Sequence, residues 1–239
     1  MGNLYIIATP IGNLEDITFR AIRTLKEVDF CFAEDTRTTG ILFKKYDIHT
    51  RLISYNAHNH RERNEEIIKF LQEGKSIGLV SDAGTPGISD PGYSAVAEVR
   101  KAIPEAKIVP IPGASALTAF VSALGMGTHA WTFYGFLPHK NGRQTMLKEM
   151  LASEKSSIFY ESTHRIEKFL KEVEKLQGET CTLVQSGEGR AEPAPRRIAV
   201  GKELTKIFED FLIGTPAEIL KIFELDPKKL KGEFVVMII

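Results

Sequence analysis

Residues 81–92 read SDAGTPGISDPG and directly follow a strand-like run at residues 76–80. Three glycines and two prolines in twelve residues cannot build a regular helix or strand. The glycines permit positive φ angles and close backbone approach, the prolines remove hydrogen-bond donors, and Asp82, Ser89 and Asp90 add acceptors. The segment is predicted to be a shaped loop at a ligand crevice, with an ordinary long turn as the alternative.

The first half of the chain alternates short β-branched or aromatic runs with helical patterns. This alternation predicts a mainly parallel five-stranded sheet with helices on both faces. The predicted strands are residues 4–8, 30–33, 51–54, 76–80 and 107–111, and the helices that follow them are residues 18–28, 38–46, 62–72, 93–102 and 114–123.

Gly125 and Gly127 break this pattern and predict a hinge, which gives two α/β domains, residues 1–124 and 125–239. The second half predicts a smaller mixed sheet with helices. Its strands are expected at residues 131–134, 156–160, 180–184, 197–206, 209–213 and 233–239, its helices at 143–151, 164–176 and 216–223, and a polar loop at 185–195.

Composition limits the class of protein and its partners. The chain has 239 residues, of which 43% are hydrophobic, enough for a well-buried core. Its 31 basic and 31 acidic residues cancel, so any contact with RNA must be a local patch. Cys31 and Cys181 lie in apolar runs typical of buried strands and are expected to be reduced thiols. With no leader and no apolar run near ~18 residues, the protein is expected to be soluble and cytoplasmic, without a membrane partner.

Two further loops are of the same kind as residues 81–92. Residues 9–16 follow the first predicted strand, and residues 110–117 follow the fifth and lead into a helix that Ser115 could cap. Loops after strands of a parallel sheet open at its carboxyl edge, where α/β proteins bind ligands. The first loop lacks the G-x-G-x-x-G pattern, and the GKS at residues 74–76 enters a strand, so neither a dinucleotide site nor a Walker motif is predicted.

Six segments, in order along almost the whole chain, carry a resemblance to a known family. They are TPIGNL at 9–14, EDTR at 34–37, LVSDAGTPGISDPG at 79–92, GFLP at 135–138, FYES at 159–162 and ELTK at 203–206. Together they resemble the bacterial 16S rRNA cytidine 2′-O-methyltransferases of the tetrapyrrole-methylase superfamily. The resemblance implies two α/β domains, with S-adenosylmethionine bound between them, and a homodimer. The chain departs from the family at Lys202, where arginine is frequent, and in the longer polar connector at 185–195.

The resemblance also implies which residues bind the cofactor. They belong to the three loops, which would use backbone groups, and to the strand end at residues 159–161. They are Pro10, Gly12, Asn13, Asp82, Ala83, Gly84, Gly87, Ile88, Ser115, Ala116, Tyr160 and Glu161. No metal is expected.

Methyl transfer to a ribose hydroxyl is an in-line displacement that needs a base, or a cation that lowers the hydroxyl pKa, beside the 2′-oxygen. Asp35, Glu203 and Lys206 are the candidates, with a surface or interdomain ion pair as the alternative for each. Strand alternation over residues 197–206 would place Lys202 and Lys206 on one face and Glu203 on the other. Lys206 is then expected to polarise the hydroxyl, and Glu203 to brace the domain interface.

Residues 56–64, NAHNHRERN, are the densest polar segment. Arginine and asparagine suit phosphate and sugar, and a histidine ring can stack on an unpaired base; a solvated helix start is the alternative, and a metal site lacks a third ligand. A second basic loop covers residues 139–143. The predicted RNA contacts are Arg37, His58, His60, Arg61, Arg63, Lys140, Arg143 and Lys202, and the expected acceptor is 16S rRNA in the small ribosomal subunit.

Two other functions remain open. C-methylation of a tetrapyrrole precursor uses the same superfamily fold, but those enzymes usually carry a Gly-rich acidic first loop, whereas this chain has Thr9 to Asn13. A non-catalytic small-ligand sensor would use the cleft for binding alone.

Overall fold

The computed structural model describes residues 1–125, 130–185 and 195–239, except for the side chains of residues 179–185. The chain forms two compact units, Met1–Ala116 and Leu117–Ile239. The division after Ala116 lies one helix before the boundary predicted after residue 124. Nearly all of α5 (Ala116–Ala123) therefore belongs to the second unit. The predicted loop at 185–195 falls mostly on residues 186–194, outside the described residues.

The first unit contains the predicted parallel sheet, and the prediction of its fold class is confirmed. The strand order is β3-β2-β4-β1-β5, and every neighbouring pair is parallel. The strands are β1 (Asn3–Ile7), β2 (Phe30–Ala33), β3 (Arg51–Ser54), β4 (Ile77–Val80) and β5 (Lys107–Ile111).

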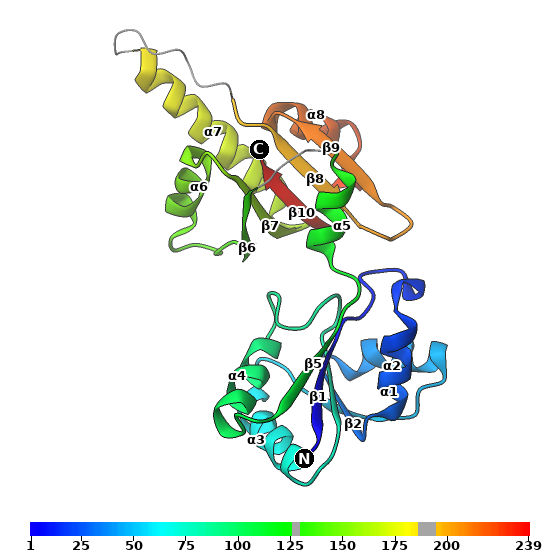
Figure 1. Ribbon diagram of the computed structural model, residues 1–239. Coiled ribbons are helices and arrows are strands. Elements are labelled where there is room, and N and C mark those ends of the chain that lie inside the picture. The colour runs from blue at the N-terminus through cyan, green and yellow to red at the C-terminus, as the bar shows by residue number, and fades with distance from the viewer. Residues whose placement is uncertain (126–129, 186–194) are drawn as a thin grey trace. The chain divides into compact units, whose positions relative to one another are not determined.

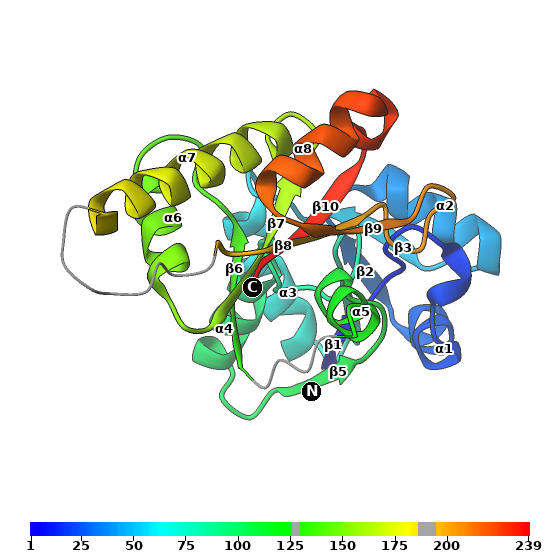
Figure 2. The ribbon, with the colours of Figure 1, turned by 90° about the horizontal axis from the view of Figure 1, so that it is seen from above.

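Helices cover both faces of this sheet (Figures 1 and 2). Ile7 and Cys31 pack with α1 (Phe19–Glu27) and α2 (Thr36–Tyr46) on one face, after the short helix η1 (Leu14–Asp16). Leu4 and Phe32 pack with α3 (His60–Gln72) and α4 (Gly92–Ala102) on the other. Burial raises the pKa of the Cys31 thiol, which is free and buried as expected.

The strand order sets the place for a ligand. β4 lies between β2 and β1, and the helix after β4 covers one face while the helices after β1 and β2 cover the other. The chain therefore leaves β4 towards one face of the sheet, and leaves both neighbouring strands, β1 and β2, towards the other face. Such reversals open the crevices in which α/β proteins bind ligands.

The second unit is built on a mixed sheet of order β6-β7-β10-β8-β9, with β6 and β7 parallel and the other pairs antiparallel. The strands are β6 (Trp131–Phe136), β7 (Ser156–Ser162), β8 (Ile198–Lys202), β9 (Asp210–Gly214) and β10 (Glu233–Ile238).

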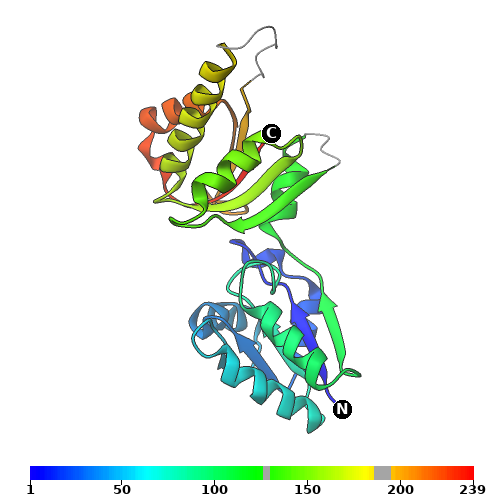
Figure 3. The same ribbon diagram turned by 90° about the vertical axis from the view of Figure 1, so that its left-hand side faces the viewer.

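Three helices share one core on this sheet: α6 (Arg143–Ala152), α7 (Ile166–Gln185) and α8 (Pro216–Leu225), which leads into η2 (Pro227–Leu230). Figure 3 shows α7 in yellow beside α8 in orange. α5 packs elsewhere: Phe120 stacks on Phe211 at 6.1 Å between ring centroids. A Cβ on Gly201 would lie 2.5 Å from the Phe120 ring, so this glycine permits the close approach.

Two predicted elements of the second unit are wrong. Residues 180–184 are the end of α7 instead of a strand, and Cys181 lies in that helix. Apolar residues at 166, 169, 170, 173 and 176 continue to 181 and 184 with helical spacing, which outweighs the β propensity of the threonines and the valine. β8 ends at Lys202, four residues before its predicted end at 206. None of the helices in the described ranges is long and apolar enough to cross a membrane.

Candidate active site

The loops after β1 and β4 are joined at the carboxyl edge of the parallel sheet. Thr9 N donates to Gly84 O at 2.9 Å, and Gly84 N donates to Thr9 O at 3.0 Å. The Thr9 hydroxyl adds a bond of 3.1 Å to Ser81 O. The loop after β5 is tied to the same group, since the Thr85 hydroxyl donates to Ala114 O at 3.3 Å. The predicted convergence of three loops is thus present within this unit.

The conformation of the β4 loop is fixed by the Asp90 side chain and by glycines with positive φ angles. Both carboxylate oxygens of Asp90 accept from Gly87 N, at 2.8 and 2.9 Å, and Oδ1 also accepts from Gly92 N at 2.7 Å. Gly84 and Gly87 have φ angles of 80° and 89°, which a side chain would strain. The loop therefore presents its backbone in a conformation that glycine permits.

Carboxylates gather where the β2 and β4 loops meet. Asp82 Oδ1 accepts from Asp35 N at 2.8 Å, and Glu34 Oε2 accepts from Asp82 N at 3.4 Å. Burial is the largest cause that raises the pKa of Glu34, with the Asp82 and Asp90 charges adding to it. Burial, with the Asp35 charge, raises the pKa of Asp82. This edge therefore carries negative charge that its surroundings disfavour.

Asp35 has a different environment. Its side chain caps α2 by accepting from Arg37 N at 2.8 Å, and it forms an ion pair with Arg37 Nη2 at 2.7 Å. Hydrogen bonds from the Arg37 side chain and backbone lower the pKa of Asp35 to about 2. A carboxylate with such a low pKa is a weak base. The Arg37 side chain remains 90% exposed and can still reach a phosphate.

The segment ELTK is a turn, so the predicted alternation of its side chains is wrong. Glu203 and Thr205 have φ angles of 50° and 67°, which fold the chain so that Lys206 Nζ lies 3.0 Å from Glu203 Oε1. Lys206 Nζ also lies 2.9 Å from Glu233 Oε2, and Glu203 Oε1 accepts from Glu233 N at 2.9 Å. Glu203 thus positions Lys206 and does not point away from it.

Charge states follow from these contacts. Partial burial lowers the pKa of Lys206, but its bonds to Glu233 and Glu203 outweigh this and raise it overall. Burial raises the pKa of Glu203, but bonds from the Glu233 backbone and from Lys206 outweigh this and lower it overall. At neutral pH this pair is a cation held by carboxylates, which suits electrostatic stabilisation better than proton abstraction.

Lys202 does not lie at the surface as an RNA contact would. Its side chain is buried, with the residue 5% exposed, and Nζ donates to Phe208 O at 3.4 Å while lying 5.9 Å from the centre of the Phe208 ring. The prediction that Lys202 faces an acceptor is wrong for this conformation, because the strand ends here and the turn that follows folds over its ammonium group.

Glu161 and Arg143 form a buried ion network in the second unit. The Glu161 side chain is fully buried, with Oε1 3.0 Å from Arg165 Nε and Oε2 3.3 Å from Arg143 Nη2. Arg143 Nε also pairs with Glu172 at 2.8 Å. The prediction that Arg143 contacts RNA is therefore wrong, because its buried guanidinium is paired inside the unit. The Glu161 carboxylate is paired as well, and the part that the strand end at residues 159–161 would play in cofactor binding stays a prediction.

The same arginines hold the loop that follows β6. Arg165 Nη2 donates to Leu137 O at 2.6 Å, and Arg143 Nη1 donates to Pro138 O at 3.4 Å. Lys140, in that loop, is exposed and available. Tyr160 packs against the rings of Phe133 and Phe136, and burial raises its pKa.

The histidine segment lies after β3, at the same carboxyl edge as the loops of the first unit. His58 and Arg61 are exposed, His60 and Arg63 are partly exposed, and Arg63 is paired with Glu66 at 2.6 Å. Asn13 caps η1 by accepting from Glu15 N at 3.1 Å. Pro10 is buried, whereas Gly12, Ala83 and Ile88 are exposed and Ser115 and Ala116 partly exposed.

Three residues of this site were not among the predicted site residues: Glu34, Asp90 and Arg165. Glu34 was visible in the EDTR segment, and Asp90 in the glycine-rich loop. No sequence pattern pointed to Arg165, because its ion pair with Glu161 forms only when the fold brings the two side chains together.

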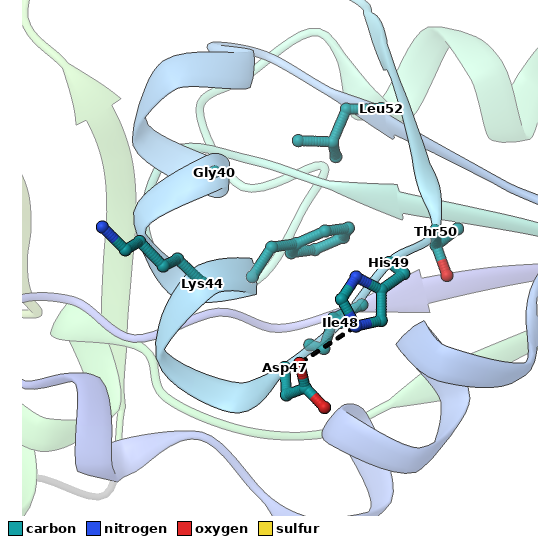
Figure 4. A pocket seen from close by; sticks show the side chains of 8 residues that line it. Gly40, Lys44, Asp47, Ile48, His49, Thr50 and Leu52 are labelled. Carbon is teal, nitrogen blue, oxygen red and sulfur yellow. Dashed lines mark ion pairs between the residues drawn. The ribbon is translucent and has the colours of Figure 1, made fainter.

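A pocket of about 470 Å³ lies at the opposite edge of the first sheet, between the end of α2 and the start of β3 (Figure 4). Its polar groups include Asp47 and His49, whose side chains are mostly exposed, with Asp47 Oδ1 2.9 Å from His49 Nε2. These two polar groups satisfy each other, so the pocket does not share the chemistry of the loops.

Solved structures show the fold, and a family model shows the class of protein. Diphthine synthase superposes with a TM-score of 0.73 at 12% identity, covering 100% of this chain and 90% of that one. Uroporphyrin-III C-methyl transferase from Thermus thermophilus, complexed with S-adenyl homocysteine, gives 0.63 at 15% identity, covering 99% and 97%. The chain belongs to the Tetrapyrrole (Corrin/Porphyrin) Methylases, whose family model matches residues 3–220.

Closer relatives narrow the family, and the resemblance found in the sequence is confirmed. Ribosomal RNA small subunit methyltransferase I from Halalkalibacterium halodurans is 43% identical, covering 99% of this chain and 75% of the relative. Its counterpart from Thermotoga maritima is 40% identical over 100% of this chain and 98% of the relative. The counterpart from Escherichia coli O157:H7 is 40% identical, with 99% and 77% covered. Within its family this chain is a methyltransferase of the ribosomal RNA small subunit methyltransferase I group.

Proposed function

We propose that this protein transfers a methyl group from S-adenosylmethionine to the ribose 2′-hydroxyl of a cytidine in 16S rRNA of the small ribosomal subunit. The observation that carries this proposal is the 40–43% identity, over essentially the whole chain, to proteins named ribosomal RNA small subunit methyltransferase I. C-methylation of a tetrapyrrole is less favoured, because the structures named for it share 13–16% of their residues with this chain.

The loops of the first unit fit S-adenosylmethionine. Gly84 and Gly87 have positive φ angles and no side chain that would obstruct a ligand, and a Cβ on Gly113 would lie 3.0 Å from the Ala8 Cβ, closer than most real contacts. Glu34 and Asp82 supply negative charge that would attract a sulfonium and an ammonium group, and a bound cation would offset the cost of ionising these carboxylates. When bound, the cofactor supplies an electrophilic methyl group.

The second unit would supply a cation for the acceptor. The transfer would form a bond between the 2′-oxygen and the methyl carbon, break the bond from that carbon to sulfur so that S-adenosylhomocysteine leaves, and release the hydroxyl proton. Lys206, charged and held between Glu203 and Glu233, would stabilise the oxygen as it loses its proton. Asp35 and Glu203, with lowered pKa values, are weak bases and would position groups, so the released hydroxyl proton would pass to water.

Exposed basic and aromatic-ring side chains would hold the RNA. Arg37 at the start of α2 and His58 and Arg61 before and within α3 lie at the carboxyl edge of the first sheet. Lys140 extends from the loop after β6. We also propose that the protein works in the cytoplasm, where ribosomal subunits are, and as a homodimer, which sedimentation would test.

Incubation with labelled S-adenosylmethionine and three acceptors tests the proposal: assembled small subunits, naked rRNA and uroporphyrinogen. Label in one cytidine of the assembled subunit is the expected result, since a neutral protein with local basic patches should recognise a folded RNA shape. Label in uroporphyrinogen alone would identify the tetrapyrrole enzyme. Cofactor binding without transfer to any acceptor would favour the sensor.

A further inference from the structure

We propose that the outward face of α1 and α2 is a second RNA-binding surface, which holds phosphates outside the acceptor site. This inference rests on the proposed function and names where more of the RNA lies. The surface consists of Arg20, Arg23, Lys26, Lys44 and Lys45, and Arg37, already assigned to RNA at the carboxyl edge, joins it to the acceptor site.

Charge separates these two helices from the pair on the other face of the same sheet. α1 and α2 together carry six basic residues and one carboxylate, Glu27. α3 carries three basic and three acidic residues, and α4 carries two and one. Because the whole chain has a net charge of zero, the excess on α1 and α2 is a local patch and not a consequence of composition.

The cations are also available. Arg20, Arg23, Lys26, Lys44 and Lys45 are exposed. Arg23 lies 4.0 Å from Glu27, at the limit of an ion pair. Within residues 1–125, 130–185 and 195–239, no ion pair involves Arg20, Lys26, Lys44 or Lys45. A phosphate backbone can therefore bind these four side chains without breaking an ion pair.

The surface is continuous with the candidate active site. α1 and α2 begin directly after the loops of β1 and β2, so Arg20 and Arg37 lie in the first helical turns at the carboxyl edge. Lys26 and Lys44 lie towards the other ends of helices about 14 and 16 Å long. Figures 1 and 2 show both helices on one side of the sheet, so an RNA strand entering the site can extend along them.

An exposed aromatic ring lies within the same surface. Phe19, at the start of α1, is 93% exposed and lies next to Arg20. A fully solvated phenylalanine beside arginines suits stacking on an unpaired base, which is a common contribution to RNA binding. An anionic membrane surface is the competing partner, and the experiment includes it.

The test compares two triple variants with the same change in net charge. Arg20→Gln, Lys26→Gln and Lys44→Gln remove the surface, whereas Lys69→Gln, Arg100→Gln and Lys101→Gln, all exposed on the other face, form the control. For small-subunit binding, we expect the first variant to lose at least about 10-fold in affinity and about two to three units in the slope of log K against log salt. Turnover at saturating subunits and cofactor affinity should stay unchanged.

A third variant tests stacking. Phe19→Ala should weaken binding about 5-fold or more with the salt slope unchanged, because a stacked base releases no counterion. Equal losses of small-subunit affinity in the two triple variants, or no loss in the first, would overturn the proposed RNA-binding surface. Methylation of the subunit by the wild type would still support the proposed function in that case. If the wild type binds phosphatidylserine vesicles, and the first triple variant loses this binding but still binds the subunit, the surface is a membrane-binding one instead. Failure of the wild type to methylate any RNA would refute the proposed function itself.

Discussion

The carboxylates of the two units differ in how they are paired. Glu161 is fully buried in the second unit, and two arginines bind it. At the loops of the first unit, Glu34 is partly exposed and Asp82 is exposed; both lie beside other carboxylates and have raised pKa values. Balanced charge in the first case holds a fold together, whereas unbalanced charge in the second marks a place prepared for a ligand.

The strongest test of this difference is Glu161→Ala. The change leaves Arg143 and Arg165 buried without their shared carboxylate, and we expect a loss of about 3–5 kcal/mol in the free energy of unfolding. Trp131, the one tryptophan, lies in β6 of the same unit, so its fluorescence during urea unfolding reports this unit. The control Glu167→Ala removes an exposed pair with Lys171 and should cost less than about 0.5 kcal/mol. Similar losses in both variants would show that the buried network has no special role.

Lys206 tests the rule that paired charges support the fold and unbalanced charges serve a ligand. It is paired with two carboxylates, yet it is proposed to stabilise the acceptor oxygen during methyl transfer. Lys206→Ala should lower turnover at least ~100-fold, the scale of a lost electrostatic group, with cofactor affinity nearly unchanged. Lys229→Ala is the matched control, since Lys229 is also partly buried and paired, with Asp210. Single-turnover methylation and cofactor titration measure the two quantities. If Glu203→Ala is inactive while Lys206→Ala stays active, Glu203 becomes the candidate base.

Sequence reasoning predicted the part of this site that depends on local chain chemistry. Strand-loop-helix alternation with glycine and proline after residue 80 predicted both the parallel sheet and its ligand edge, because proline restricts its own backbone and glycine permits conformations that other residues avoid. It failed where distant residues decide. Arg143 and Glu161 are 18 residues apart and meet because β7 and α6 pack together. Glu203 and Thr205 adopt left-handed conformations that non-glycine residues rarely show, so the turn at ELTK was mistaken for a strand.

Gly84→Val sharpens the comparison at the loop itself. A branched side chain strains the φ angle of 80° and obstructs the backbone, so S-adenosylmethionine binding should weaken at least ~10-fold. Gly74→Val is a matched control, because Gly74 has a φ angle of 84° with open space around it, in the turn before β4. Both variants should lose about 1–2 kcal/mol of stability, but Gly74→Val should bind the cofactor normally in calorimetry. Equal binding in the two variants would show that the β4 loop is only a turn.

The smallest expected effect concerns the unbalanced charge at Glu34. Since its folded-state pKa is raised, ionisation of Glu34 favours the unfolded chain, and stability decreases as pH rises from about 4.5 through that pKa. Glu34→Gln keeps an oxygen that can accept from Asp82 N but removes the charge, so the variant should be more stable than wild type at pH 7 by a few tenths of a kcal/mol. The difference should vanish below about pH 4, where Glu34 is protonated in both states.

Hydrogen exchange of β2 and β4 amides measures this stability difference, with exposed Glu105→Gln as the unchanged control. A variant that is stabilised without cofactor yet binds S-adenosylmethionine less tightly would show that the strain at this edge serves the ligand; a variant less stable than wild type at pH 7 would show that Glu34 supports the fold, as Glu161 does.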